Sequence, residues 1–280
     1  MLVKKPDIEA IEIDLLLEAI YRRWGYDFRS YARASIERRT RLFLSKSESK
    51  TISEMISRVL RDEDFFSRLV RNFSISVTEM FRDPFVYRVI RSEVAPMLRT
   101  WPHVKAWVAG CATGEEVYSL AIVLKEEGVY DRSTIYATDF NDFSLEHARE
   151  GIYEIDKLQE ATRNYQQAGG KASFADYYHA RYDAAVLEPS LRERITFANH
   201  NLVTDGVFGE MQLVFCRNVL IYFNRELQNR ALRLFTESLS HGGFLCLGTR
   251  EDLQFTEVKD QYEAVDRKAK IFKKRSVAGH

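Results

Sequence analysis

Apolar residues recur at helical spacing from the start of the chain to about residue 98. The first amphipathic segment ends at Gly25, and glycine commonly ends a helix because it adopts the left-handed backbone conformation without strain. A second helix is expected over about 31–45. Three more follow: one with Ser53 as its N-cap, one over 62–73, and one that begins with Pro84 at its first position.

The pattern changes near residue 104, where short apolar runs begin to alternate with amphipathic segments. A strand over 104–110 precedes a helix over 116–128, and a strand over 133–139 precedes a helix over 141–151. This alternation is typical of βαβ units and implies a parallel sheet. The remaining predicted elements are strands over 195–201, 211–218 and 242–251, a helix over 225–243, and an edge strand within 261–275.

A polar, tyrosine-rich stretch over 152–195 interrupts this alternation, and Gly169-Gly170 within it is a turn signal. We therefore expect two domains. The first is a helical domain over residues 1–98, and the second is a doubly wound α/β domain over residues 99–280 that carries the polar stretch as an insertion. We find no flexible linker between them, no internal repeat and no low-complexity tract.

The 280 residues include 41 basic and 41 acidic side chains, so the formal net charge is zero. Over the whole chain, this balance gives no reason to expect a nucleic acid or an anionic membrane as partner. No apolar run approaches the ~20 residues that a membrane span needs, and the N-terminus lacks the apolar core of a secretory signal. We therefore expect a cytoplasmic protein that does not insert into membranes.

Cysteine and histidine usage agrees with a reducing compartment. The three cysteines, Cys111, Cys216 and Cys246, are odd in number, form no CxxC pair and lie in apolar, strand-like stretches. The six histidines show no spacing typical of metal ligands. We expect no structural metal.

The turn after the first predicted strand carries the most informative local chemistry. Residues 109–116 read AGCATGEE, so Gly110 and Gly114 are followed at once by Glu115 and Glu116. Glycines let the backbone approach a ligand closely at the carboxyl edge of a doubly wound sheet. Carboxylates at this place repel a pyrophosphate but suit an ammonium or a sulfonium group. The alternative is a simple glycine turn whose acidic residues stabilise the start of a helix.

Asp139 ends the second predicted strand, at the place where an acidic residue accepts hydrogen bonds from ribose hydroxyls in doubly wound folds. An aspartate after a strand is also a common N-cap of the next helix, and this alternative stays open. Together, the turn and Asp139 favour a ligand that contains adenosine and a cationic centre but no phosphate. S-adenosylmethionine has this chemistry.

Four motifs, in this order along the chain, resemble those of CheR-type chemoreceptor methyltransferases: VTEMFRDP (77–84), AGCATGEEVYSLA (109–121), ATDFNDFSLEHAREGIY (137–153) and FCRNVLIYF (215–223). The resemblance implies a Rossmann-like class I methyltransferase sheet with an N-terminal all-helical domain and a small antiparallel β-subdomain inserted at about 152–198. It also implies methyl transfer from S-adenosylmethionine to glutamate side chains of a chemotaxis-type receptor, with S-adenosylhomocysteine as product.

The resemblance also implies roles for particular residues. Arg82 and Tyr222 correspond to the two residues at the reacting centre, and Ser76 stands where relatives often carry asparagine. The implied cofactor-binding residues are Thr78, Arg82, Gly110, Glu116, Asp139, Asn201, Leu202, Cys216, Arg217 and Asn218. Outside the motifs, Arg82 would be interpreted as a surface ion-pair partner of Asp83 or Glu79. Tyr222 would be interpreted as a core aromatic residue.

These residue types suit the implied reaction. A glutamate side chain has a pKa of ~4.3 and is ionised at neutral pH, so no general base is required. The task is to hold the carboxylate in line with the methyl group and the sulfur. The planar guanidinium of Arg82 can guide a carboxylate, and the hydroxyl of Tyr222 can orient one oxygen while the other attacks.

Positive charge gathers between residues 22 and 46, which contain eight basic and two acidic residues. Such a run is often only a solvated helix face. The resemblance instead implies that it faces the acidic methylation region of the receptor, with Arg33, Arg38 and Arg41 as substrate-binding residues. Attraction of this kind should weaken with salt.

In some relatives the inserted subdomain binds a C-terminal receptor peptide by strand addition. Tyr177, Tyr178 and Tyr182 are expected in its strands, but Gly169-Gly170 matches the glycine-flanked loop of those relatives only imperfectly. We therefore expect an enzyme that does not depend on such a peptide.

Two other functions stay open. One is an enzyme with the same cofactor but an RNA or small-molecule substrate, and the other is a non-catalytic adaptor that senses the cofactor. The chain lacks the Asn/Asp-Pro-Pro-Tyr/Phe loop of enzymes that methylate adenine amino groups, which counts against a nucleic-acid substrate. The presence of Arg82 and Tyr222 counts against an adaptor. Nothing in the sequence indicates an obligate dimer, so we expect a monomer.

Overall fold

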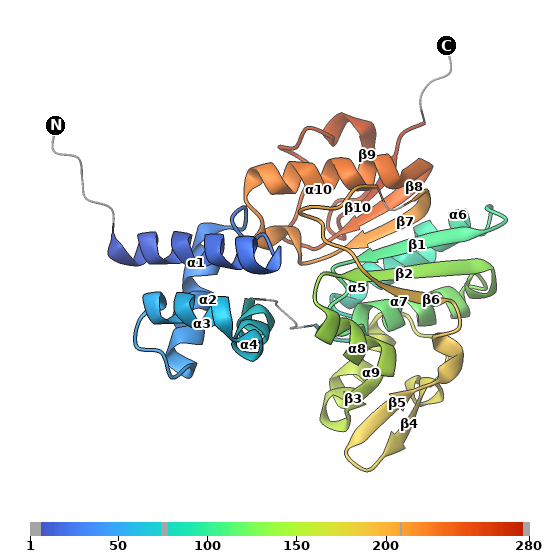
Figure 1. The fold of residues 1–280 in the computed structure, drawn as a ribbon. Helices are drawn as coiled ribbons and strands as arrows, with labels where there is room; N and C mark the ends of the chain where they lie inside the picture. The colour runs from blue at the N-terminus through green and yellow to red at the C-terminus, as the bar shows by residue number, and fades with distance from the viewer. Residues whose placement is uncertain (1–6, 74–77, 208, 277–280) are drawn as a thin grey trace. The chain divides into compact units, whose positions relative to one another are not determined.

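The computed structural model describes residues 7–73, 78–207 and 209–276. The chain divides into two compact units (Figure 1). The first unit contains residues 1–75 and 222–228, and the second contains residues 76–221 and 229–280.

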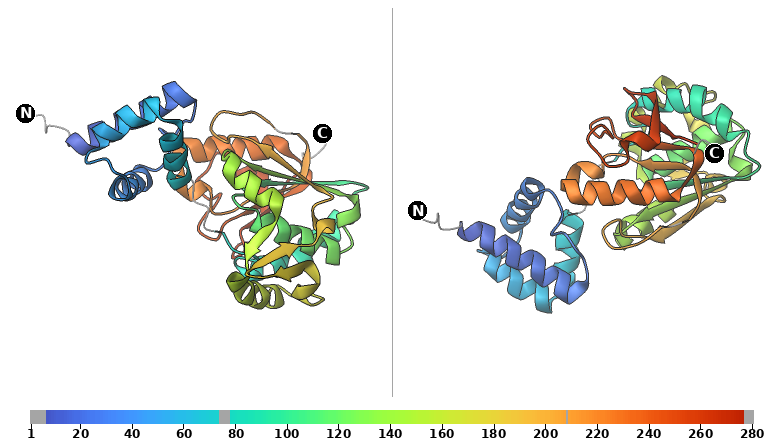
Figure 2. Two further views of the ribbon diagram at one scale, coloured as in Figure 1. Left: turned by 60° about the horizontal axis from the view of Figure 1, so that its bottom comes forward. Right: turned by 90° about the horizontal axis from the view of Figure 1, so that it is seen from above.

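In its described residues, the first unit consists of four helices and a short returning segment (Figure 2). The helices are α1 (Ile8–Trp24), α2 (Arg33–Lys46), α3 (Ile52–Arg61) and α4 (Glu63–Phe73). Gly25 ends α1 with a φ of 79°, and its N–H donates to the Tyr21 carbonyl at 2.9 Å, so the predicted glycine cap is confirmed. Apolar side chains from all four helices are buried, among them Ile20, Phe43 and Leu69.

The N-cap of α3 is Thr51 and not the predicted Ser53, which lies inside the helix. The Thr51 hydroxyl accepts a hydrogen bond from the Glu54 N–H at 3.2 Å, and the Glu54 carboxylate accepts one from the Lys50 N–H at 2.7 Å. Two hydroxyl residues lie close together in the sequence, and the extended backbone at Thr51 (φ −137°) decides which of them caps the helix.

Residues 222–228 join the first unit although they come much later in the sequence. The Ala32 N–H donates to the Tyr222 carbonyl at 2.7 Å. The rings of Tyr31 and Phe223 pack edge to face, with their centroids 5.1 Å apart. Local patterning did not predict this long-range contact, which makes the returning segment part of the helical unit.

The second unit contains a seven-stranded sheet in the order β6-β2-β1-β7-β8-β10-β9. Its strands are β1 (Val104–Ala109), β2 (Ser133–Asp139), β6 (Ile195–Asn199), β7 (Met211–Cys216), β8 (Leu239–Leu247), β9 (Tyr262–Asp266) and β10 (Ile271–Lys274). The strands from β6 to β8 in this order are parallel, whereas β10 runs antiparallel to both β8 and β9. The predicted doubly wound, Rossmann-like α/β sheet is confirmed.

Two predictions about the C-terminal strands are wrong in detail. The tail forms a hairpin whose second strand, β10, lies between β8 and β9, where a single edge strand was expected. The helix α10 (Arg225–Ser238) ends earlier than predicted, because β8 already begins at Leu239 and contains Gly243. A Cβ at Gly243 would lie 2.9 Å from the Ser240 carbonyl oxygen, so the strand requires glycine there.

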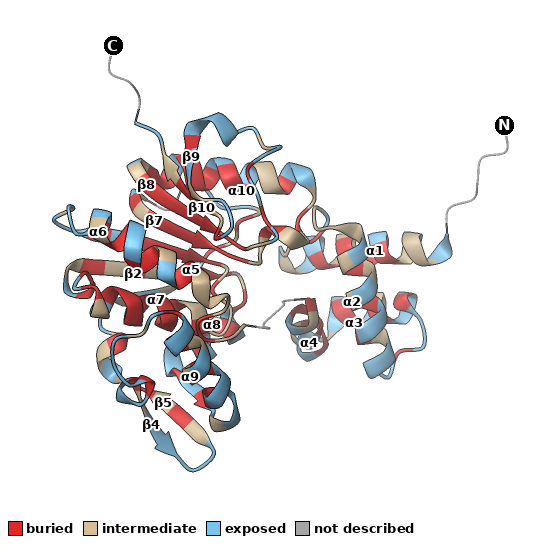
Figure 3. Ribbon diagram, turned by 180° about the vertical axis from the view of Figure 1, so that it is seen from behind, coloured by how far each residue is buried: buried red, intermediate tan, exposed pale blue. Residues whose placement is uncertain are grey.

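Helices cover both faces of this sheet (Figure 1). In β1, Trp107 packs edge to face on Phe235 of α10 at 5.3 Å. The neighbouring Val108 belongs to the core cluster on the other face, which includes α7 (Glu115–Glu126). The helix α8 (Asp142–Glu150) packs against β2 and β6. The central strands are consequently buried along most of their length (Figure 3).

The segment before β1 belongs to the second unit. It consists of α5 (Pro84–Val89), the π-helix η1 (Ile90–Val94) and α6 (Ala95–Leu98). Val86, Tyr87 and Ile90 are buried in the core of the sheet unit. The compact units therefore divide at 75/76, whereas the sequence-based expectation was a boundary at 98/99. Helical periodicity does not distinguish a helix that covers a sheet from one that belongs to a bundle.

The insertion contains the predicted small antiparallel sheet, in the order β3-β5-β4. Its elements are β3 (Ile152–Glu154), α9 (Leu158–Gln167), β4 (Tyr178–Arg181) and β5 (Ala184–Leu187). The helix α9 was not predicted. Of the three tyrosines expected in strands, Tyr178 lies in β4, Tyr177 lies in a 3-10 helix, and Tyr182 lies in the hairpin turn with a φ of 55°.

Short 3-10 helices connect these elements: η2 (Tyr130–Arg132), η3 (Ile155–Lys157), η4 (Phe174–Tyr177), η5 (Pro189–Leu191), η6 (Leu220–Tyr222) and η7 (Lys259–Gln261). Cys111, Cys216 and Cys246 are buried and free. Within residues 7–73, 78–207 and 209–276, no helix has the length and apolar character needed to cross a membrane.

Candidate functional site

Four strands of the main sheet end at the same edge, and most of the predicted cofactor-binding residues lie at these ends. Gly110 follows β1, Asp139 ends β2, Asn201 follows β6 and Cys216 ends β7. Because these strands are parallel neighbours in the sheet, their carboxyl ends lie side by side. The chain order reverses between β1 and β7, and doubly wound sheets bind their ligands at such a switch point.

The turn between β1 and α7 requires glycine. Gly110 has a φ of 73°, and a Cβ there would lie 2.6 Å from Cγ2 of Val219, in the turn after β7. The N–H groups of Gly110 and Cys111 both donate to the Thr138 carbonyl, at 2.8 and 2.9 Å. The first turn is thereby held closely against the ends of both neighbouring strands, β2 and β7.

Asp139 joins the first two turns of the site. Its carboxylate accepts hydrogen bonds from the Ala112 N–H at 3.0 Å and the Asn141 N–H at 2.9 Å. The N-cap of α8 is Asn141, whose side chain accepts from the Phe143 N–H at 3.1 Å, so the alternative that Asp139 is the N-cap is wrong. Burial raises the pKa of Asp139. Each carboxylate oxygen has a further lone pair that can accept from a ligand hydroxyl.

A buried arginine connects three of the predicted motifs. Arg217 Nη1 lies 2.6 Å from Glu116 Oε1, and Arg217 Nη2 lies 2.6 Å from Asp83 Oδ2. Nη1 also donates to the Arg82 carbonyl at 3.2 Å. The Arg217 side chain is 0% exposed, so these contacts replace its hydration. The Asp83 carboxylate, considered above as a surface partner of Arg82, is thus paired with Arg217.

The charges around Arg217 favour a cationic ligand. Glu116 and Asp83 place two carboxylates on the Arg217 guanidinium, and the charge of Arg82 also acts on Glu116. Asp139 adds a third carboxylate at the end of β2, which neighbours β1. Burial raises the pKa of Glu116, although the Arg217 guanidinium opposes this rise. Since a positive ligand charge would lessen the remaining carboxylate repulsion, the site fits an ammonium or a sulfonium group better than a phosphate.

Left-handed backbone conformations gather in these turns. Among the described residues, six other than glycine have a positive φ between 48° and 60°, and four of the six lie here: Phe81, Asp83, Ala112 and Asn218. Such conformations cost about 1–2 kcal/mol each and persist only where the surrounding contacts fix them. They cluster at functional sites, which agrees with the place of the predicted residues.

Glu251 is a site residue that the sequence analysis missed. Its carboxylate accepts hydrogen bonds from the Gly248 N–H at 2.6 Å, the Asn218 N–H at 3.2 Å and the Ile221 N–H at 3.2 Å. It therefore shapes the turn after β7 from the turn after β8. An acidic residue at the end of a predicted strand, the signal that identified Asp139, would have drawn attention to it.

Local contacts and burial fix the other cofactor-binding candidates. The Asn201 side-chain oxygen accepts from the Val203 N–H at 2.9 Å, and Leu202 is buried, so the turn after β6 is well fixed. Burial raises the pKa of the Cys216 thiol well above its usual value, which keeps the thiol protonated. Thr78 is half-buried at the start of the Arg82 loop. Ser76 lies outside the described residues.

Tyr222 and Arg82 lie in different compact units. Tyr222 is half-buried in the helical unit, and the guanidinium carbon of Arg39 lies 5.8 Å from the centroid of its ring. Arg39 Nη1 in turn donates to the Asn72 carbonyl at 2.5 Å. The shared catalytic role of Tyr222 and Arg82 therefore stays a prediction.

The three predicted substrate-binding arginines differ in their surroundings. Arg33 forms ion pairs with Asp14 of α1 and with Glu37 of its own helix. Arg41 lies 2.5 Å from Glu9 of α1. Arg38 is exposed, and in the part of the chain that the structure describes no ion pair joins it to another residue. Of the three, Arg38 alone presents its charge fully to a partner.

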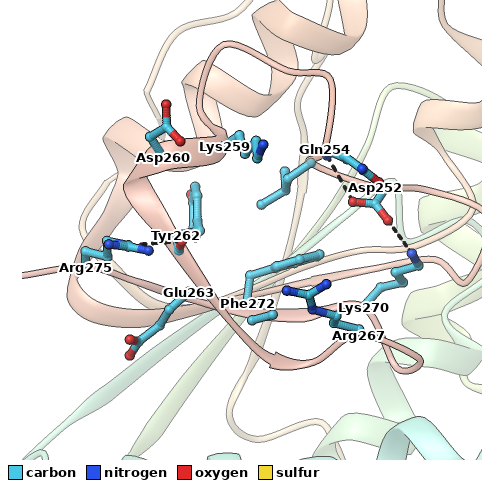
Figure 4. A pocket seen from close by; sticks show the side chains of 12 residues that line it. Asp252, Gln254, Lys259, Asp260, Tyr262, Glu263, Arg267, Lys270, Phe272 and Arg275 are labelled. Carbon is cyan, nitrogen blue, oxygen red and sulfur yellow. Dashed lines mark hydrogen bonds and ion pairs between the residues drawn. The ribbon is translucent and has the colours of Figure 1, made fainter.

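Each unit also has a hollow lined by none of the predicted cofactor-binding residues. One is a groove of about 540 Å³ beside the β9–β10 hairpin, lined only by residues between 252 and 275 (Figure 4). Its lining mixes basic and acidic side chains and includes none of the predicted cofactor residues. The other, of about 630 Å³, lies in the helical unit, and Phe43 and Phe65 contribute to its lining. Its basic lining residues are Lys46, Arg58, Arg68 and Arg71.

Known protein families and relatives match almost the whole chain. Residues 76–271 match the family model described as CheR methyltransferase, SAM binding domain, and residues 11–74 match the one described as CheR methyltransferase, all-alpha domain. A Pseudomonas putida protein named Cher3 and described as a methyltransferase is 52% identical over 264 residues, which cover 94% of this chain and 97% of the relative. A chemotaxis protein methyltransferase of Listeria innocua is 28% identical over 250 residues, covering 89% of this chain and 92% of the relative.

Proposed function

The chain belongs to the CheR methyltransferase family and its sheet unit binds S-adenosylmethionine; on this premise we propose that it methylates glutamate side chains of chemoreceptor-like signalling proteins. The products would be glutamate methyl esters and S-adenosylhomocysteine. The observation that carries the proposal is the buried Arg217, which holds Glu116, Asp83 and the Arg82 carbonyl together beside the strand ends. This arrangement supports an acidic site for a sulfonium cofactor, and Arg82, whose carbonyl accepts from Arg217, carries a cationic side chain suited to a carboxylate.

The residues at the strand ends fit the cofactor. Asp139 offers carboxylate oxygens for ribose hydroxyls, and Glu116 offers one for the ammonium group. Gly110 allows the backbone to approach without a side chain in the way. When bound, the cofactor supplies an electrophilic methyl group on a positively charged sulfur.

The chain's own task in the reaction is positioning. The substrate carboxylate is ionised at neutral pH, so one of its oxygens supplies the electron pair for the new C–O bond while the C–S bond breaks and its electrons stay on sulfur. Arg82 guides the carboxylate, and Tyr222 orients the oxygen that does not attack. Exclusion of water from the carboxylate raises its reactivity, and an ion pair with Arg82 that is too tight would lower it.

The helical unit is the part of the chain that we assign to the protein substrate. A region with several glutamates is acidic, and the basic groove of Lys46, Arg58, Arg68 and Arg71 complements such a region. Its single acidic lining residue, Glu48, is highly exposed and lies 3.7 Å from Arg58. Arg38 adds an exposed positive charge to the helical unit, whereas Arg33 and Arg41 are partly neutralised by α1.

Mass spectrometry of the methylated acceptor tests this proposal. Membranes that contain a chemoreceptor are incubated with the protein and S-adenosylmethionine carrying a deuterated methyl group. The proposal predicts the heavy methyl group on glutamate side chains of the receptor. A heavy methyl group on lysine, on RNA or on a small molecule would overturn it, and so would cofactor binding without transfer to any receptor.

A further inference from the structure

The loop that carries Arg82 is held in an unfavourable backbone conformation on both sides of this residue. Phe81 has a φ of 54° and Asp83 has a φ of 55°. Left-handed conformations at two non-glycine residues on either side of Arg82 would rearrange if nothing opposed them. The contacts that hold the loop therefore fix the position of the Arg82 backbone, from which the side chain extends.

Contacts from three elements hold this loop. On the C-terminal side, Arg217 donates to the Arg82 carbonyl and pairs with Asp83. On the N-terminal side, the Phe81 N–H donates to Ser119 Oγ of α7 at 2.9 Å. The third contact comes from α9, where Asn164 Nδ2 donates to the Met80 carbonyl at 3.2 Å. Of these hydrogen bonds, the one from Asn164 comes from the inserted segment.

Aromatic packing strengthens the contact with α9. The Phe81 ring is fully buried and packs edge to face on Tyr165, the neighbour of Asn164, with centroids 5.3 Å apart. Phe174 of η4 lies 5.9 Å from the same ring. The inserted segment thus covers the Phe81 side chain and bonds the backbone immediately before it.

A buried polar network fixes α9 itself. Arg91, in the π-helix η1, pairs with Glu126 at 2.5 Å and donates to the Ala168 carbonyl at the end of α9 at 3.0 Å. The hydroxyls of Tyr165 and Tyr177 donate to the same Glu126 carboxylate. Burial raises the pKa of Glu126, but these hydroxyls and Arg91 lower it by more, so it stays ionised and holds its partners. The network therefore ties α9 to η1 and to the end of α7.

We propose that Asn164 is a positioning residue for Arg82, acting through the Met80 carbonyl. The inference depends on the proposed function only for the role of Arg82 at the cofactor and the reacting carboxylate. It gives the inserted segment a part in shaping the site, through α9 and independently of any peptide bound by its strands. Loss of the Asn164 bond should loosen residues 80–83 and leave the sheet intact.

Hydrogen exchange of backbone amides tests the structural half of this inference. Asn164→Leu removes the donor at nearly constant volume, and Gln166→Leu makes a matched change on the exposed side of α9. We expect exchange of the amides in 80–83 to be about tenfold faster in Asn164→Leu, as the loss of one net hydrogen bond would give. Exchange in β1 and α7 should not change, and Gln166→Leu should match the wild type in all three regions.

Unchanged exchange in 80–83 would overturn the inference, and so would uniformly faster exchange in 80–83, β1 and α7. If Asn164→Leu does not fold, Asn164→Asp is the second variant, because a carboxylate keeps the shape but cannot donate to the Met80 carbonyl. Asn164→Gln keeps a donor and should restore part of the protection.

Calorimetry with S-adenosylhomocysteine tests whether loss of the Asn164 hydrogen bond weakens cofactor binding through Arg82. Asn164→Leu should weaken binding about fivefold in the wild type and less than twofold in an Arg82→Ala background, since the two residues act in series. Equal losses in both backgrounds, or no loss in either single variant, would overturn the inference. Neither this titration nor the exchange measurement uses a methyl acceptor, so they can succeed even if the proposed receptor substrate is wrong.

Discussion

Arg217 Nη1 lies 2.6 Å from Glu116 Oε1, and the Arg217 side chain has no exposure to solvent. The pair joins the turn after β7 to the start of α7. A second nitrogen of Arg217 reaches Asp83, so one side chain fixes the relative positions of three segments that are distant in the sequence. The geometry of the site therefore depends on this arginine.

Replacement of Arg217 by lysine should lower the stability of the folded protein. An ammonium cannot bond Glu116, Asp83 and the Arg82 carbonyl with the same planar geometry, and a buried carboxylate would lose its partner. We expect a loss of about 3 kcal/mol in the free energy of unfolding. Arg233→Lys, at the half-exposed pair with Glu257, is the control and should change stability by less than about 0.5 kcal/mol. Chemical denaturation measures both, and equal losses would contradict the structural role of Arg217.

Gly110→Ala should disturb the site in two ways, by a steric clash and by backbone strain. The new Cβ would lie 2.6 Å from Val219 Cγ2, at a φ of 73°. Gly128 has a similar φ of 67° but nothing within 4 Å of an added Cβ, so Gly128→Ala isolates the backbone cost of about 1 kcal/mol.

Thermal denaturation and cofactor titration separate the two effects. Gly110→Ala should lower the melting temperature more than Gly128→Ala and should alone weaken cofactor binding. Adding Val219→Ala to Gly110→Ala should restore part of the loss by relieving the contact. If Gly110→Ala and Gly128→Ala behave alike, close packing of the first turn does not matter for binding.

The pH dependence of stability should reveal the titration of the buried Glu115 carboxyl group. Burial raises the pKa of Glu115 to about 7, from 4.5 for an exposed side chain. The folded protein therefore binds more protons than the unfolded chain between these values, and this group's contribution falls as the pH rises through about 7. Glu115→Gln should thus stabilise the protein relative to wild type at pH 8.5, by up to about 3 kcal/mol, and much less at pH 4.5.

Denaturation curves of wild type and Glu115→Gln across this pH range provide the test. The exposed Glu226, in the first turn of α10, offers a control with the same substitution, and Glu226→Gln should give no comparable gain in stability at pH 8.5. A stability difference for Glu115→Gln that is constant with pH would show that the carboxyl group does not titrate in this range.

Charge reversal at Arg38 should affect the protein substrate and not the cofactor. Arg38 is exposed, whereas reversal of Arg41 would also break its ion pair with Glu9. In a methyl-transfer assay, Arg38→Glu should raise the apparent KM for the receptor severalfold at low salt, and the difference should shrink with added salt. Calorimetry should give wild-type affinity for the cofactor. An unchanged KM would remove Arg38 from the substrate-binding surface.

Local patterns in the sequence predicted the parts of the fold that depend on nearest neighbours. The glycine turn after β1 and the acid at the end of β2 lie where strand ends of a doubly wound sheet require them. Thr51 replaced Ser53 as the N-cap of α3 because the two alternatives differ only in backbone conformation, which composition does not encode.

What the sequence did not predict depends on contacts between distant residues. The return of 222–228 to the helical unit, the bond from Asn164 to Met80 and the support from Glu251 all join segments far apart in the chain. Arg33 and Arg41 of the basic run over 22–46 lie in α2, and their partial neutralisation by α1 depends on which helices pack together. Periodicity identifies a helix face and does not identify its neighbour.

The most direct test of the central claim is the chemical nature of the transferred methyl group. Receptor-containing membranes are incubated with tritium-labelled S-adenosylmethionine and either wild-type protein or Arg82→Ala, and the washed protein is then treated with mild base. Wild-type protein should transfer label that the base releases as volatile methanol, because carboxyl methyl esters hydrolyse readily, and Arg82→Ala should transfer much less. Label that withstands the base would contradict glutamate methylation.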